Sequence, residues 1–132
     1  MPREDVMKWL RTQFMPHIWC PGCGHGVIMH AIIRALCALN KDPDKTVISS
    51  GIGCSSRMPG YINSCTLHTA HGRSLAFATG VKLANPELTI VDVMGDGDCS
   101  AIGGNHFIHA CRRNIGSQPR SEERRVGKEC RS

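Results

Sequence analysis

A strongly apolar segment that runs into a glycine-rich acidic loop is the feature that most limits how this chain can fold. Residues 88–95, LTIVDVMG, form the strongest predicted strand and lead directly into GDGDCSAIGG. A second predicted strand, residues 46–50, is rich in β-branched residues and leads into GIGCSS. Strands of this composition, each bounded by turn-forming residues, are typical of a buried sheet.

Helical patterns alternate with these two strands. Apolar residues recur at helical spacing over residues 5–13, 27–39, 72–85 and 105–113, and Pro86 ends the third helix. Residues 14–26 are predicted to form a loop because they contain two prolines and three glycines. The alternation predicts an α/β domain with a parallel sheet. Ligands of such sheets bind at the carboxyl ends of the strands, where both glycine-rich loops are expected.

The composition is that of an ordinary soluble domain, with 41% hydrophobic and 20% charged residues in a chain of 132. No apolar run is long enough to span a bilayer, so no membrane association is expected. The N-terminus carries Glu4 and Asp5 and has no apolar signal-peptide core. We therefore expect a cytoplasmic protein, in which the eight cysteines are not a disulfide framework.

Residues 120–132, RSEERRVGKECRS, differ from the rest of the chain. They have no hydrophobic period and resemble the translation of a sequencing-library adapter. We expect residues 117–132 to be a non-native, disordered tail and residues 1–116 to be the N-terminal part of one domain. Without residues 120–132, 11 Lys and Arg remain against 8 Asp and Glu. This small excess predicts no nucleic-acid partner.

The GDGD loop is a candidate cation and phosphate site. Its glycines allow the backbone to approach a ligand closely. Asp96, at the end of the predicted strand, could hold a divalent cation that bridges phosphates. A simple turn that contains acidic turn-forming residues explains the same pattern equally well.

Three cysteines form a second candidate site. Cys20 and Cys23 stand in a C-x2-C pair, and Cys54 follows 31 residues later in the other glycine-rich loop. Thiolates on flexible backbone are typical iron–sulfur ligands. Zinc, with His17 or His25 as a further ligand, and a thiol redox pair are open alternatives. The other cysteines before the tail are predicted to lie in helix cores (Cys37, Cys111) or in loops (Cys65, Cys99).

Four segments together resemble one known family. They are WCPGCGHG, SGIGCSSRMPGY, TAHGRSLAFATGVKLANPELTIVDVMGDGD and AIGGNHFIHACRRNI. In this order they resemble the β subunit of the 2-oxoacid:ferredoxin oxidoreductases, and most closely the branch that acts on 2-oxoglutarate. The resemblance extends over residues 7–115. It implies the thiamine diphosphate-binding fold, with a doubly wound parallel sheet that is incomplete in this chain.

The resemblance also implies cofactors and site residues. Asp96 matches the Mg²⁺ ligand that anchors thiamine diphosphate, and the residues beside that cofactor are Gly53, Cys54, Ser55, Gly95, Gly97 and Asp98. Cys20, Cys23 and Cys54 match three of the four ligands of a [4Fe–4S] cluster. Arg57 matches a basic residue near the substrate carboxylate, and His68 and His71 fall on the thiazolium side.

The implied activity is the oxidative decarboxylation of a 2-oxoacid to an acyl-coenzyme A, with electrons passed through the cluster to ferredoxin. An α subunit would be the partner. The family's fourth cluster cysteine and second Mg²⁺ ligand fall outside the matched part, so we expect the chain alone to hold no cluster and to be inactive. The alternative is a small zinc-binding or thiol-redox module without catalysis.

Overall fold

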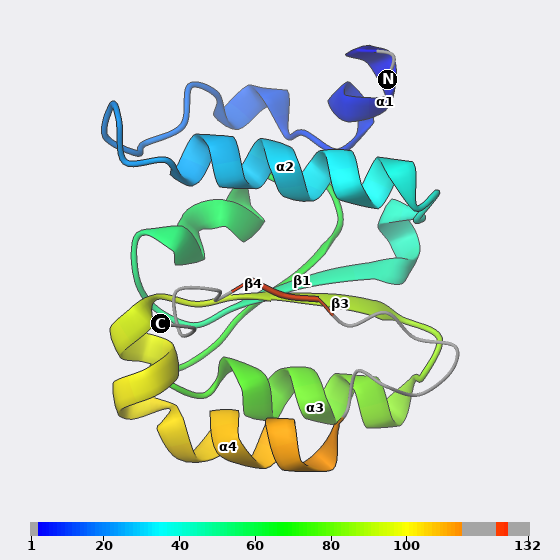
Figure 1. Cartoon of the computed structure of the whole chain (residues 1–132). Coiled ribbons are helices and arrows are strands. Elements are labelled where there is room, and N and C mark those ends of the chain that lie inside the picture. The colour runs from blue at the N-terminus through cyan, green and yellow to red at the C-terminus, as the bar shows by residue number, and fades with distance from the viewer. Residues whose placement is uncertain (1–2, 115–123, 127–132) are drawn as a thin grey trace.

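The structure is a computed structural model that describes residues 3–114 and 124–126. Figure 1 shows a sheet covered by α1 and α2 on one side and by α3 and α4 on the other. The helices are α1 (Arg3–Lys8), α2 (His25–Ala38), α3 (Ser74–Ala84) and α4 (Gly104–Arg113), and the short helical turns are η1 (Thr12–Phe14), η2 (Pro43–Lys45), η3 (Ser55–Gly60) and η4 (Gly97–Ile102). The strands are β1 (Thr46–Ser50), β2 (Cys65–His68), β3 (Thr89–Val93) and β4 (Arg124–Val126).

The sheet has the order β2-β1-β3-β4, and every neighbouring pair is parallel. All residues of β1 and β3 are buried, as expected for strands with helices on both faces. Thr46 pairs with Thr89 and Ser50 with Val93, so the two strands begin and end at the same level. The α/β fold with a parallel sheet, predicted from the alternating pattern, is therefore confirmed.

Alternate residues of the central strands pack against opposite helical layers. Ile48 and Val91 join the core formed with α2, which buries Ile33 and Leu36. Val47 and Ile90 pack on the other side with Ala78 of α3. The two-residue period of a strand therefore divides its side chains between two cores, and each core holds one helix against the sheet.

Buried polar groups fix both ends of α3 beneath the sheet. At its start, the Ser74 hydroxyl lies 2.8 Å from that of Ser49 and also donates to the Asp92 carboxylate. At its end, the buried Lys82 ammonium donates to the carbonyls of Pro86, at 3.0 Å, and Leu88. A buried polar group is tolerated only when it is hydrogen-bonded, so these bonds define where α3 lies against β1 and β3.

Three predictions of secondary structure are wrong. The first helix ends at Lys8 because the following backbone pairs with residues 61–63, as in the bond from the Arg11 N–H to the Tyr61 carbonyl (2.9 Å). Strand β2 was not predicted, and its Cys65 lies in a strand rather than a loop. The two glycine-rich loops contain the helical turns η3 and η4.

The predicted tail and the absence of a membrane span are the two remaining expectations about the fold. Of the predicted tail, residues 124–126 form β4, and residues 117–123 and 127–132 lie outside the described residues. The non-native origin of the tail therefore stays a prediction. Within residues 3–114 and 124–126, no helix combines the length and apolar composition needed to cross a membrane.

The core on the α2 side is expected to dominate stability. Leu36→Ala, at a position only 3% exposed, should lower the free energy of unfolding by about 2–5 kcal/mol because it leaves a cavity in the core. Leu83→Ala, on α3 at a position 72% exposed, is the matched control and should change it by about 0.5 kcal/mol or less. Urea unfolding of the two variants checks this, and equal losses would contradict the assignment of the core.

Candidate functional site

A cavity of about 620 Å³ opens at the carboxyl ends of β1 and β3. Its walls come from residues 52–55 after β1, residues 95–98 after β3, His25 and Ile28 in the first turns of α2, and His71 before α3. A cavity of this size can hold a ligand as large as a cofactor. The two glycine-rich loops therefore meet at one site, as the parallel sheet predicted.

The two loops approach each other backbone to backbone. A Cβ atom on Gly53 would lie 3.6 Å from the Gly95 Cα, and one on Gly95 would lie 3.5 Å from the Ile52 carbonyl oxygen. Gly53 also has a φ of 142°, which side chains other than hydrogen rarely allow. Small residues here leave the space above the strand ends open for a ligand.

The two acidic residues of the GDGD loop have different surroundings. Asp96 is exposed and faces the cavity. Asp98 is buried, and its Oδ1 accepts the Gly72 N–H at 2.6 Å and lies 2.6 Å from Nδ1 of His71. Its Oδ2 is buried without a hydrogen bond among the described residues and faces Gly51. Asp96 is therefore the carboxylate available to a cation.

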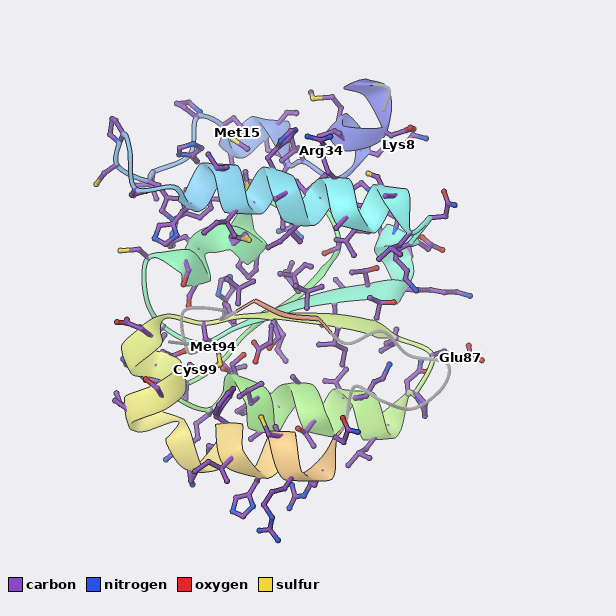
Figure 2. The ribbon with its side chains drawn as sticks, in the orientation of Figure 1. Lys8, Met15, Arg34, Glu87, Met94 and Cys99 are labelled. Atoms are coloured by element: carbon purple, nitrogen blue, oxygen red, sulfur yellow. The ribbon has the colours of Figure 1, made fainter. Side chains whose placement is uncertain are left out.

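Apolar side chains complete the cavity wall. Ile52, Met58 and Met94 line it, and none of the three was predicted from the sequence as a site residue. Figure 2 shows Met94 beside Cys99 at the end of β3, on the α3 side of the sheet, where both pack with Leu75. The apolar run that continues past β3 to Met94 is the sequence signal that could have identified this wall.

His25 is a further residue that sequence reasoning left undecided. It lines the cavity, and its Nδ1 is buried with no hydrogen bond in the described part of the chain. Its ring packs at 5.7 Å from the ring of Trp19. The position of His25 two residues after Cys23 was the available signal, because α2 begins at His25, beside the cavity.

The cysteine-bearing loops are tied together by Trp19. Its Nε1 donates to the Cys54 carbonyl at 2.6 Å, and its ring contacts Tyr61 edge-on at 5.1 Å. Cys54 lines the cavity, whereas Cys20 and Cys23 line a neighbouring recess of about 560 Å³. All three cysteines are exposed. Among residues 3–114 and 124–126, no three His, Cys, Asp or Glu side chains form a group that could hold a metal ion.

Of the other predicted site residues, only His71 lines the cavity. Arg57 is exposed on η3, outside the cavity wall. His68 ends β2, and its Nδ1 lies 3.0 Å from the Ser50 hydroxyl, which itself donates to the Ser56 carbonyl at 3.2 Å. His68 therefore contacts the end of β1 rather than the ligand space.

The remaining cysteines have structural surroundings. Cys37 is half-buried and its thiol donates to the Asp5 carbonyl at 3.6 Å. Burial, and then the negative charge of Asp5, raise the pKa of the Cys37 thiol, which disfavours the thiolate needed for metal binding. Cys99 is buried on η4. Cys111 is exposed, so its predicted place in a helix core is wrong, because that face of α4 is turned to solvent.

Comparisons with known proteins agree with the location of the cavity. Residues 51–117 match the family described as "Thiamine pyrophosphate enzyme, C-terminal TPP binding domain". This segment contains both glycine-rich loops that line the cavity.

The chain also has close relatives. It is 60% identical over 113 residues to "2-oxoglutarate synthase subunit KorB" of Archaeoglobus fulgidus, covering 86% of this chain and 42% of the relative. It is 54% identical over 112 residues to the protein of that name from Methanocaldococcus jannaschii, covering 85% of this chain and 42% of the relative. The chain thus spans about two fifths of the length of these curated relatives.

A solved structure has the same fold. The 2-oxoglutarate:ferredoxin oxidoreductase from Magnetococcus marinus, with 2-oxoglutarate, coenzyme A and succinyl-CoA bound, superimposes with a TM-score of 0.81 at 43% identity. The match covers 88% of this chain and 39% of that chain.

The contact between Gly51 and Asp98 gives a direct test of the site geometry. A Cβ on Gly51 would lie 1.8 Å from the Asp98 Oδ2, and this carboxylate is held in place by His71 and Gly72. Gly51→Ala should therefore lower the free energy of unfolding by about 1–3 kcal/mol.

Gly60→Ala is the matched control, because a Cβ there meets nothing within 4 Å. It should leave stability unchanged or raise it by up to about 1 kcal/mol. Thermal and urea unfolding measure both variants. A Gly51→Ala protein as stable as Gly60→Ala would show that the Asp98 carboxylate does not pack against Gly51.

Proposed function

Because the chain belongs to the thiamine pyrophosphate enzyme family, whose TPP-binding domain residues 51–117 match, we propose that its cavity binds thiamine diphosphate. We further propose that the chain is part of the β subunit of a 2-oxoacid:ferredoxin oxidoreductase that acts on 2-oxoglutarate. The observation that carries this proposal is the cavity itself, in which both glycine-rich loops of the matched segment meet at the carboxyl ends of β1 and β3.

The residues of the cavity fit a diphosphate held through Mg²⁺. Asp96 offers an exposed carboxylate at the start of η4, and carboxylate oxygens are preferred Mg²⁺ ligands. Gly53, Gly95 and Gly97 leave the backbone accessible beside it, and Ser55 also lines the cavity. When bound, the cofactor supplies the electron sink that decarboxylation of a 2-oxoacid needs.

The other walls of the cavity are mainly apolar. Ile52, Met58 and Met94 give the site an apolar surface, and Met58 is fully buried. Once a ligand fills the cavity, this apolar surface would exclude water from the side of the ligand that faces it. Arg57 is exposed on η3, next to the loop that carries Cys54, and we assign it to the carboxylate of the 2-oxoacid.

Three exposed cysteines are the candidates for an electron path. We assign Cys20, Cys23 and Cys54 as ligands of a [4Fe–4S] cluster, which is supported by their exposure and by the bond between Trp19 and the Cys54 carbonyl. In residues 3–114 and 124–126 these three side chains do not come together as a ligand set. We propose that the β subunit works with an α subunit in the cytoplasm, and that coenzyme A and ferredoxin take part in the reaction.

Binding of the cofactor depends on Asp96 in this proposal. Asp96→Asn should weaken the binding of thiamine diphosphate in the presence of Mg²⁺ by about tenfold or more, because an amide oxygen lacks the negative charge of the carboxylate. Isothermal titration of the chain measures the affinity.

Asp44→Asn removes an exposed carboxylate from η2, outside the cavity, and should bind as the wild type does. Equal affinities for the wild type and Asp96→Asn would contradict the assignment of the cation site.

The activity is tested anaerobically with the whole β subunit and its α subunit. With coenzyme A present, 2-oxoglutarate should support faster reduction of a viologen dye or ferredoxin than pyruvate does. Omission of coenzyme A should abolish the reduction, and the present chain alone should give none. A colourless complex that holds only zinc and reduces no acceptor with any 2-oxoacid would exclude the proposed reaction.

A further inference from the structure

Asp98 and His71 form a hydrogen-bonded pair at the wall of the cavity. The Asp98 side chain is 1% exposed and the His71 side chain 46% exposed, and the distance from Oδ1 to Nδ1 is 2.6 Å. Both residues line the cavity, but the Asp98 side chain is buried in the protein, while that of His71 is half-exposed at the wall. The resemblance to known proteins placed both residues near the cofactor but assigned no relation between them.

Asp98 belongs to the cavity wall, but its two carboxylate oxygens are already occupied or enclosed. Oδ1 already accepts the Gly72 N–H at 2.6 Å in addition to its contact with His71. Oδ2 is buried against Gly51, where the space for even one added carbon is missing. A carboxylate enclosed in this way cannot also coordinate a cation in the cavity.

The pair determines which nitrogen of His71 carries a proton. A carboxylate oxygen only accepts hydrogen bonds, so the Nδ1 that faces it is the donor. In the neutral ring Nε2 is then a bare acceptor, and it is the nitrogen left for the cavity. A carboxylate that accepts the N–H of a metal-binding histidine fixes the tautomer and orientation of that ring by the same means.

The same carboxylate also holds the backbone beside His71. Gly72 has a φ of 70°, and a Cβ there would lie 2.5 Å from Ile102 and 2.8 Å from the Gly103 nitrogen. The segment between β2 and α3 is therefore pressed against the end of η4, and Asp98 of η4 binds both its main chain and its imidazole.

We propose that Asp98 is a positioning residue that holds His71 with Nδ1 protonated and Nε2 directed at the bound ligand, and is not itself a ligand of the cofactor or its cation. The identity of that ligand as thiamine diphosphate or the 2-oxoacid rests on the proposed function. The pairing of the two side chains does not depend on it.

The tautomer is measured without any ligand. In the ¹⁵N-labelled chain at mildly alkaline pH, two-bond correlations of the His71 ring should show Nδ1 protonated and Nε2 unprotonated. Asp98→Asn should shift the ring toward the other tautomer, because a neutral amide holds the Nδ1 proton less strongly. Asp96→Asn, the matched change two residues away, should leave the His71 signals in the wild-type tautomer. A wild-type ring protonated on Nε2 overturns the proposal, whether or not any variant folds.

A double-mutant cycle then tests how Asp98 acts on binding. Asp98→Asn should weaken the affinity for thiamine diphosphate with Mg²⁺ by about tenfold in the wild-type background. In the His71→Ala background the same change should cost about twofold or less, because the residue through which Asp98 acts is gone.

An undiminished effect of Asp98→Asn in the His71→Ala background would show that Asp98 acts on binding by a route other than His71, and would overturn the positioning role. If the wild-type chain binds no thiamine diphosphate, the proposed function of the cavity is contradicted. In that case the tautomer measured by NMR still decides whether Asp98 positions His71.

Discussion

The parallel pairing of β1 with β3 is the constraint on which the site depends. Ser50 lies opposite Val93, so the two strands end at the same level and the loops that follow them leave the sheet side by side. Both strands are buried on both faces, which makes a shift of register costly, because it would move side chains between the α2 and α3 cores. The cavity exists because this pairing brings the two glycine-rich loops together at the carboxyl ends of β1 and β3.

The turn after β3 gives Asp96 and Asp98 opposite surroundings, one exposed and the other buried. The two carboxylates are separated by one glycine, yet the start of η4 leaves Asp96 exposed and directs Asp98 inward. The inward carboxylate fixes the segment before α3, and the outward one remains available to a cation. One carboxylate of this short turn is thus open to a ligand, while the other holds His71 and Gly72 in place.

Much of the fold and the position of the site could be predicted from the sequence. Residues 46–50 were predicted as a strand with the observed bounds, because their β-branched run lies between a turn and a glycine. Strand β2 could not be predicted, since Cys65–His68 is only four residues long, is partly exposed and gains its strand conformation from pairing with β1. The different roles of Asp96 and Asp98 were also hidden, because both stand in the same GDGD string. Only the packing of Gly51 and Gly72 against one carboxylate distinguishes them.

The buried hydrogen bonds at both ends of α3 limit which parts of the cavity can change among related chains. With Ser74 bound to Asp92 at one end and Lys82 bound to the Pro86 and Leu88 carbonyls at the other, the helix cannot slide along the sheet. Related chains that adapt to ligands of different shape are then expected to change exposed side chains of the cavity wall such as Ile52, while α3 stays in place. Sequence divergence across such a family should accordingly be lowest at the two ends of this helix and higher along its exposed face, where Phe77 and Leu83 meet solvent.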